Sequence, residues 1–408
     1  MGAEQLLEEA KMYEQQLIEK RRYLHQHAET EFDLHDTVAF VKAELQSMGY
    51  EPQECGKAGL IVNAGGKKSG KVFLIRGDMD ALPMAEQAEV DFPSETGKMH
   101  ACGHDMHTTM MLGAAKLLKE HEDEIEGTVK LMFQPAEEIF EGAHDMIEAG
   151  VLKNPDVDAA LMIHVMAGQP FPAGTVIVSD GGISAPGADY FRIHIQGKGC
   201  HGSMPNAGVD PITVAAHIVT ALQEIHAREL GLIDEAVLTI GKIQAGQAAN
   251  VIPDTLDMEG TIRTYDEEVR AFIKQRMTEI SQGIASSFRA EAEVIFGKGC
   301  PVLKNDGELS KCAAQYVTEL LGQGKAFTQG QLLAMAGEGK AQKAAGSEDF
   351  AYVSQEVPSI MLALAAGEPA KGYAYPQHHP KVKFDESVLS PGSAVYAYTA
   401  MRWLEEHK

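Results

Sequence analysis

The chain is poor in the features that mark secreted and membrane proteins. Its 408 residues include five cysteines, an odd number, and these lie far apart. A disulfide scaffold is therefore not expected, and a reducing compartment is. No apolar run reaches the roughly 18 residues of a membrane span, and the charged N-terminal segment lacks the apolar stretch of a signal peptide. These absences predict a cytoplasmic protein.

Positive charge is also scarce. The chain has 35 Lys and Arg against 59 Asp and Glu, and a net charge of −24. Nucleic acid and anionic membranes would be repelled, so neither is expected as a partner. What the chain has is 44% hydrophobic residues, enough for a large core without disulfides or a structural metal. The length predicts two or three domains.

The first half of the chain follows the pattern of an α/β domain. After a helical segment at 4–48, short apolar runs alternate with segments of helical spacing, which is typical of a largely parallel sheet. We expect strands at 60–66, 71–78, 128–135 and 158–165, and helices at 106–121, with Asp105 as N-cap, and at 142–149.

The pattern changes near residue 187, where apolar and polar residues begin to alternate, as in half-exposed strands. Such strands are expected at 188–199, 236–246, 256–265 and 292–297, with helices at 211–228 and 267–287. This is an open α+β sandwich. The α/β pattern then returns, with a helix at 310–321, a strand at 357–367 and a helix at 390–407. We therefore predict a domain of residues 187–298 inserted into a catalytic α/β domain made of residues 1–186 and 299–408.

Five segments combine metal-ligand residue types with strand ends or stiff turns. The first is GDMDALP, in which Asp78 and Asp80 follow the apolar run VFLI. Active sites collect at the carboxyl ends of strands in open α/β sheets. Acids at this place could equally cap a helix or bond a turn.

The second segment, HACGHDMH, places Cys102 and His104 on either side of Gly103 where a helix is expected to begin. Thiolate and imidazole are both zinc ligands, and a helix N-terminus lowers the pKa of a thiol. The pattern leaves open whether His107 supports the site or is simply hydrogen-bonded.

The other three segments are weaker when taken singly. They are QPAEE with Glu137 and Glu138, MIHV with His164, and PQHHP with His378 and His379. An acidic turn, a core histidine and a surface loop would explain them equally well. Together with Cys102 and His104 they form a coherent shell for one or two zinc-like ions.

Two glycine- or alanine-rich turns in the inserted segment carry polar groups that could bind an oxyanion or a carboxylate. GKGCHGSMP contains His201 and AANVIPD contains Asn250. The residues alone favour ordinary hairpin turns.

The motifs GDMDALP, HACGHDMH, QPAEE, HV, GKGCHGSMP, ANVIPD, GTIRT, GSEDF and HHP occur in this order. The ordered set resembles the metal-dependent amidohydrolase branch of the aminoacylase and carboxypeptidase family, which includes hippurate hydrolases, N-acetyldiaminopimelate deacetylases and auxin-conjugate hydrolases. The resemblance implies a general base, Glu137, and an acid that orients the site, Asp80. It implies five metal ligands: Cys102, His104, Glu138, His164 and His378.

The resemblance also implies that His201 and Asn250 stabilise the tetrahedral intermediate in a neighbouring active site. The inserted domain would then serve as lid and would form a homodimer. Two departures bear on the substrate: Cys200 precedes His201, and HAETEF lacks the proline usual after its histidine. At the position of Asp78, the dinuclear aminoacylases and carboxypeptidases have a ligand histidine. The amidohydrolase branch resembles this chain in having Asp there.

The implied reaction is hydrolysis of a small-molecule N-acyl amino acid, or a related amide, by metal-activated water. Zinc is the expected cofactor, with manganese, nickel or cobalt as alternatives. Two other readings stay open. A dipeptidase or aminopeptidase would need an acidic counter-charge for the free amino group, which Glu348 and Asp349 of GSEDF supply. A non-catalytic protein with a structural zinc site would need no base beside the ligands.

Overall fold

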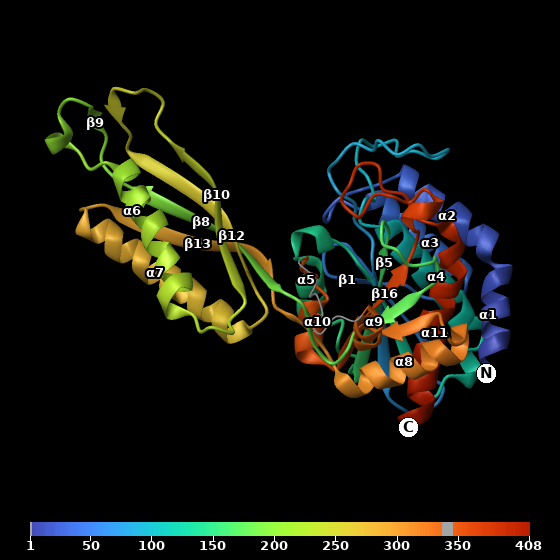
Figure 1. Ribbon diagram of the computed structural model, residues 1–408. Coiled ribbons are helices and arrows are strands. Elements are labelled where there is room, and N and C mark those ends of the chain that lie inside the picture. The colour runs from blue at the N-terminus through green and yellow to red at the C-terminus, as the bar shows by residue number, and fades with distance from the viewer. Residues whose placement is uncertain (1, 337–345) are drawn as a thin grey trace. The chain divides into compact units, whose positions relative to one another are not determined.

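A computed structural model describes residues 2–336 and 346–408, and it divides into two compact units (Figure 1). The large unit comprises the described residues up to Ser184, those from Lys304 to 336 and those from Glu348 onward. The small unit comprises residues 185–303 together with Gly346 and Ser347. Each unit has its own hydrophobic core.

The large unit is built on a mixed sheet with a parallel centre. Its strands, in the described part of the chain, run in the order β1-β2-β4-β3-β5-β16-β6-β15. Strand β3 pairs in parallel with β4 and β5, and β5 pairs in parallel with β16. The strands are β1 (Gln53–Cys55), β2 (Gly59–Gly65), β3 (Val72–Asp78), β4 (Thr128–Gln134), β5 (Ala159–Met166), β6 (Val176–Val178), β15 (Ala326–Thr328) and β16 (Ser359–Ala365).

Helices cover both faces of this sheet. Helices α4 and α11 pack together on one face of β3, and α5 and α10 lie on the opposite side of the sheet (Figure 1). Because both faces are covered, every residue of β3 is buried, which is why its sequence has no alternation. The helices are α1 (Ala3–Met12), α2 (Glu14–Gln26), α3 (His35–Ser47), α4 (His104–Glu120), α5 (Gly142–Glu148), α8 (Gly307–Leu321), α9 (Gln329–Ala336), α10 (Ala351–Glu356) and α11 (Leu389–Glu406).

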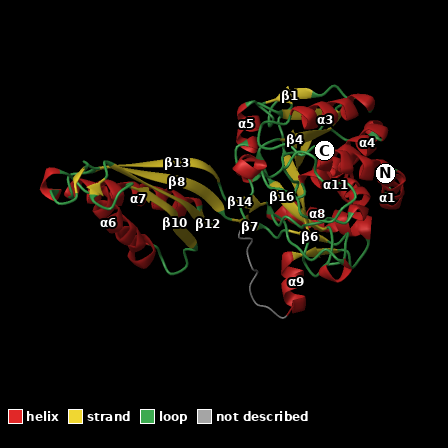
Figure 2. Cartoon of the chain, turned by 90° about the horizontal axis from the view of Figure 1, so that it is seen from above, coloured by secondary structure: helices red, strands yellow, loops and turns green. Residues whose placement is uncertain are grey.

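The small unit is an open sandwich. Within residues 185–303 its sheet runs β10-β12-β8-β13 with every pair antiparallel. Helices α6 and α7 lie along one face, as Figure 2 shows, and the other face is open. The elements are β8 (Gly187–Gln196), β10 (Ala236–Ala245), β12 (Thr255–Thr264), β13 (Glu291–Cys300), α6 (Pro211–Glu224) and α7 (Glu267–Ser287); the short strands β9 (Cys200–His201) and β11 (Val251–Ile252) form a separate pair. Strands β7 (Gly182–Ala185) and β14 (Leu303–Asn305), most of whose residues belong to the large unit, form another pair. The expected fold class, an α/β domain interrupted by an α+β sandwich, is confirmed.

Two local expectations were wrong. The segment 4–48 is not one helix but α1, α2 and α3, with a break at Tyr13 and a second one at 27–34. Asp105 is not an N-cap. Helix α4 begins at His104, two residues before the expected start at residue 106, and its N-cap is Gly103. Gly103 has φ of 96°, and a Cβ there would lie 2.4 Å from the side chain of Val165. Only glycine therefore fits at the turn into α4.

Among the helices of the described residues, none combines the length and the apolar character needed to cross a bilayer.

Candidate metal centre

Three strands of the large sheet deliver polar groups to one edge. Parallel pairing places Asp78, the last residue of β3, opposite Gln134, the last residue of β4. Strand β5 runs parallel to β3 on its other side and carries His164 near its carboxyl end. Residues that follow these strands in sequence are therefore gathered at the same edge, as is usual for sites in α/β sheets.

Asp80 fixes the backbone of the two glutamates that follow β4. Its carboxylate accepts hydrogen bonds from the amide of Glu137 at 3.0 Å and from the amide of Glu138 at 3.2 Å. The two glutamates lie in a short 3-10 turn between Ala136 and Phe140, which are both left-handed, with φ of 54° and 57°. Such conformations are strained for residues other than glycine and persist only where the surroundings hold them. The backbone that carries the two adjacent carboxylates is thus held in place.

Two histidines at this edge, His104 and His164, have their Nε2 atoms available as metal ligands. The Nδ1 of His104 donates to the carbonyl of Asp80 at 2.8 Å, and the Nδ1 of His164 donates to the carbonyl of Val165 at 2.7 Å. A hydrogen bond from Nδ1 leaves the lone pair on Nε2, which is the arrangement usual for metal-binding histidine. The Nε2 of His104 is buried and has no hydrogen-bond partner among the described residues.

The five expected ligands come together in two overlapping groups, both containing Cys102. One is Cys102, His104 and His164, and the other is Cys102, Glu138 and His378; in each, the ligand atoms lie within 4.8 Å of one another. The Cys102 sulfur is 3.5 Å from the Nε2 of His164, and the Nε2 of His378 is 3.6 Å from the Oε1 of Glu138. That Oε1 is a second buried atom without a hydrogen-bond partner. This donor set of sulfur, imidazole and carboxylate fits a zinc-like cation.

The charge balance of the site also favours a cation. Burial, together with Glu348, Glu138 and Asp349, raises the pKa of Glu137 well above its usual range. Burial, with Asp80 and Asp78 nearby, raises the pKa of Glu138 to about 7 although His104 opposes this. Crowded, buried carboxylates of this kind are relieved by a divalent ion, which offsets both their burial and their repulsion.

His378 reaches the site from the loop between β16 and α11. It has φ of 62°, and its amide donates to the carbonyl of Ala101 at 2.9 Å. That bond ties the loop to the turn that carries Cys102. The prolines on either side of the QHH segment restrict the loop further.

An ion-pair network beneath the site went unrecognised in the sequence. Arg76 is fully buried in β3, and its guanidinium bonds Asp78 at 2.6 Å, Glu348 at 2.8 Å and Asp349 at 2.9 Å. Gln134 accepts from Arg76 and donates to Asp349, both at 2.8 Å. The available signal was a single arginine inside a buried apolar strand, where an unpaired charge would be very costly.

His201 and Asn250 lie close together at a two-stranded pair of the small unit, formed by β9 and β11. Strands β9 and β11 pair with His201 opposite Val251, and the carbonyl of Asn250 accepts the amide of Gly202 at 2.8 Å. The Nδ1 of His201 accepts the amide of Ser203 at 3.1 Å, and both His201 and Asn250 are exposed. Their turn geometry is thus established, and their role toward a substrate stays a prediction.

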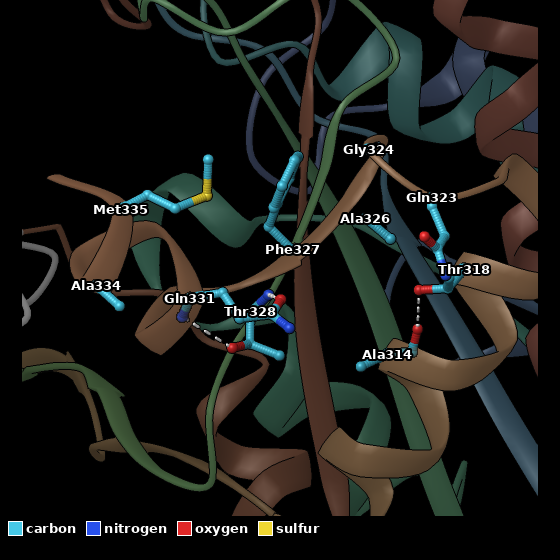
Figure 3. A pocket seen from close by; sticks show the side chains of 10 residues that line it. All are labelled: Ala314, Thr318, Gln323, Gly324, Ala326, Phe327, Thr328, Gln331, Ala334 and Met335. Carbon is cyan, nitrogen blue, oxygen red and sulfur yellow. Dashed lines mark hydrogen bonds between the residues drawn. The ribbon is translucent and has the colours of Figure 1, made fainter.

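A pocket of about 610 Å³ lies elsewhere on the large unit, between α8, β15 and α9 (Figure 3). Phe327 and Met335 flank it, and the Thr318 hydroxyl donates to the carbonyl of Ala314 within α8 at 2.7 Å. None of its described lining residues is a histidine, cysteine or acid. It therefore offers no metal chemistry.

Comparison with known proteins agrees with this geometry. Residues 74–402 match the family described as peptidase family M20/M25/M40. The chain belongs to this family. An N-acetylcysteine deacetylase of Bacillus subtilis is 36% identical to this M20 chain over 98% of the chain and 99% of the relative. An IAA-amino acid hydrolase of Arabidopsis thaliana is 36% identical over 96% of the chain and 85% of the relative.

A solved structure from Bacillus subtilis, described as a dinuclear metal-binding peptidase of the M20 family, superposes with a TM-score of 0.77 and 34% identity. It covers 97% of this chain, and 99% of its own length is matched. The expected resemblance is thus confirmed. This M20 chain is a metal-dependent amidohydrolase, and members of its family bind one or two divalent metal ions.

Proposed function

We propose that this M20 chain hydrolyses the amide bond of N-acyl amino acids, with Glu137 as general base and Cys102, His104, Glu138, His164 and His378 as metal ligands. The observation that carries the proposal is the pair of adjacent carboxylates fixed by Asp80. Glu138 shares a ligand group with Cys102 and His378, whereas Glu137 is grouped with neither of these two residues.

The division of labour between the two glutamates follows from their surroundings. Glu137 is buried at 5% exposure, next to His104, whose Nε2 is 3.8 Å from its Oε2. Burial keeps the proton affinity of a carboxylate high, as a general base near neutral pH requires. Glu137 takes the proton from the attacking water and later delivers it to the leaving nitrogen.

A divalent ion bound here would polarise the carbonyl and lower the pKa of a coordinated water. The chain's own part is to hold the donor atoms in place around the ion. Zinc is favoured by the thiolate of Cys102, with manganese, nickel and cobalt as other candidates for the same donor set.

The names of two relatives support the substrate class. One is named for N-acetylcysteine and the other for amino acid conjugates of IAA, and both names denote an acylated amino acid. We infer that the substrate of this chain is also a small acylated amino acid. The experiment below is designed to identify the acyl group and the amino acid.

The dipeptidase reading is weakened by the position of GSEDF. Both acids of this motif are buried, with Glu348 at 5% exposure and Asp349 at 0%. Both pair with the guanidinium of Arg76. Carboxylates that are buried and already bound to a guanidinium are poorly placed to receive the free amino group of a dipeptide.

The structural-zinc reading is weakened by the surplus of functional groups. A structural site is usually closed by four ligands and has no free base. Here the candidate donors are more than four, because Cys102, His104, Glu138, His164 and His378 come together and Glu137 lies beside them.

The deciding experiment is release of free amino acid from a matched panel of N-acetyl, N-benzoyl and N-succinyl amino acids and of dipeptides. The full chain would be stripped with a chelator and reloaded separately with zinc, manganese, cobalt or nickel. We expect turnover of acylated amino acids only after reloading. Full activity of metal-free protein, or a preference for dipeptides, would overturn the proposal.

We also propose that His201 and Asn250 donate hydrogen bonds to the developing oxyanion and act on a neighbouring copy in a homodimer. Strand β10, which is an edge of the small sheet in the described part of the chain, supports self-association because strand edges invite pairing. His201→Ala should lower kcat about 10²–10³-fold while leaving metal content and folding intact. If subunits exchange, mixing this variant with Glu137→Gln should restore activity. No restoration in a proven heterodimer would exclude action between copies.

A further inference from the structure

Strand β3 stops pairing with β5 before β5 ends. The register between them finishes with Arg76 opposite Met162, whereas β5 continues to Met166. Beyond Met162, the backbone groups of β5 that point toward β3 are buried and no longer pair with it. They need other partners, because an unpaired buried amide is costly. Tyr396 supplies the first replacement. Its hydroxyl donates to the carbonyl of Arg76 at 2.7 Å and accepts the amide of Ile163 at 2.9 Å.

The next residue facing that side is Val165, and three side chains bond its peptide groups. Its amide donates to the Nε2 of His107 at 2.8 Å. Its carbonyl accepts from the side-chain amide of Gln377 at 2.6 Å and from the Nδ1 of His164 at 2.7 Å. One residue of β5 thus joins helix α4, strand β5 and the loop that carries His378.

Both ring nitrogens of His107 make hydrogen bonds in this arrangement. Because its Nε2 accepts a hydrogen bond, its Nδ1 carries the proton and donates to Asp78 at 2.5 Å. No lone pair remains for a metal ion. The ring stands edge-on to that of His164, with centroids 4.7 Å apart and an interplanar angle of 74°. His107 therefore limits both the strand and the ring orientation of His164.

Gln377 plays the corresponding part for the loop. It precedes His378, which is held in a left-handed conformation at φ of 62°. Two hydrogen bonds restrain this part of the loop: the amide of His378 to the carbonyl of Ala101, and the side chain of Gln377 to the carbonyl of Val165. The second of these shares its acceptor with His164.

We propose that Gln377 and His107 are positioning residues of the metal centre, which act through the peptide groups of Val165 to fix His164 and His378 relative to each other. The inference rests on the proposed function, since it takes these two histidines as ligands. Groups that orient metal ligands typically change metal affinity about 10–100-fold when they are removed. The effect should appear in the metal site itself and not only in stability.

The test uses Co²⁺ as the probe, because its visible absorption reports ligand geometry. The metal-free full chain would be titrated with Co²⁺ against a chromogenic chelator. Gln377→Met has a similar shape and loses the donor, so we expect affinity to fall about 10-fold or more and the cobalt bands to shift. Gln377→Glu should be worse, because a carboxylate cannot donate and faces the Val165 carbonyl. Gln331→Met, on α9, is the matched control and should behave as the wild type.

Two substitutions test the hydrogen bond between the amide of Val165 and His107. His107→Gln can keep an acceptor for the amide of Val165, whereas His107→Leu removes it. We expect the cobalt affinity to follow the order wild type, His107→Gln, His107→Leu. If His107→Leu does not fold, the Gln377 variants still decide, since that side chain is only half-buried on a loop.

The outcomes separate this inference from the proposed function. If the wild type binds no Co²⁺, or if His164→Ala leaves binding unchanged, the ligand assignment is wrong and the inference falls with it. If the wild type binds and His164→Ala does not, but Gln377→Met retains wild-type affinity and spectrum, only the inference is overturned. A lower melting temperature with an unchanged spectrum would likewise reduce Gln377 to a structural role.

Discussion

The two sheets of this protein treat polar residues in opposite ways. In the large sheet both faces are covered, so a charged residue such as Arg76 is buried and must be paired on every side. In the small sheet one face is open, and Arg192 pairs there with Asp257 in partial contact with water. The same residue type is therefore a tightly constrained part of the site in one sheet and a surface group in the other. Where the fold gives a polar residue no access to water, its partners must come from the protein itself.

The largest expected difference between the sheets is in catalysis. Glu137→Gln should keep metal but lower kcat about 10²–10⁴-fold, because the proposed general base is lost. Metal content by elemental analysis and turnover of the best N-acyl substrate would be measured together. Glu293→Gln, on the open face of β13, is the matched control and should leave both unchanged. Near-normal turnover of Glu137→Gln would show that another group is the base.

The next difference is in stability. Arg76→Met leaves Asp78, Glu348 and Asp349 without their cation, and breaking a buried ion pair in this way costs about 3–5 kcal/mol. Arg192→Met removes a partly exposed pair and should cost about 0–1 kcal/mol. Urea unfolding of the metal-free protein would measure both. Equal losses would contradict the contrast between the sheets.

A smaller effect depends on pH and concerns His25 of α2. Burial and Arg21 lower the pKa of His25, but hydrogen bonds to Asp105 and Glu86 outweigh them and raise it overall. His100 also lies nearby, with ring centroids 6.4 Å apart. A raised pKa means that the folded state binds the proton more tightly than the unfolded state. The stabilisation is then fully present below about pH 6.5 and is lost as the pH rises through the folded-state pKa.

The unfolding free energy of His25→Gln should accordingly fall short of the wild type by more at pH 6 than at pH 9. Denaturant titrations at a series of pH values would show this. Leu24→Ala, a buried neighbour without a titratable group, should give a deficit that does not change with pH. A deficit of His25→Gln that grows toward high pH would reverse the assigned direction.

The smallest expected effect is on the open face. Ile295→Thr, at a position that is 41% exposed, should change stability by no more than about 0.5 kcal/mol. Ile75→Thr, fully buried in β3, places a hydroxyl among apolar groups and should cost about 1–3 kcal/mol or more. A large loss at Ile295 would indicate that this face is covered by another molecule.

Much of the fold could be read from the chain because it depends on local pattern. Continuous apolar runs predicted β3, β4 and β5, and alternation predicted β8 with its open face. Helix boundaries were less predictable. The start of α4 is decided by Gly103, whose lack of a Cβ matters only because Val165 approaches it from a distant strand.

The sequence by itself determined the fold class and the family, and it yields the proposed set of donor residues, since these depend on residue types in a fixed order. Only the tertiary structure decided how these residues are held. It paired Glu348 and Asp349 with Arg76, and it joined His107, Gln377 and His164 at Val165. These contacts connect residues far apart along the chain. Their physical reason is that β3 stops pairing with β5 before β5 ends, so side chains from elsewhere must satisfy the buried backbone groups, and no local pattern records where two strands cease to pair.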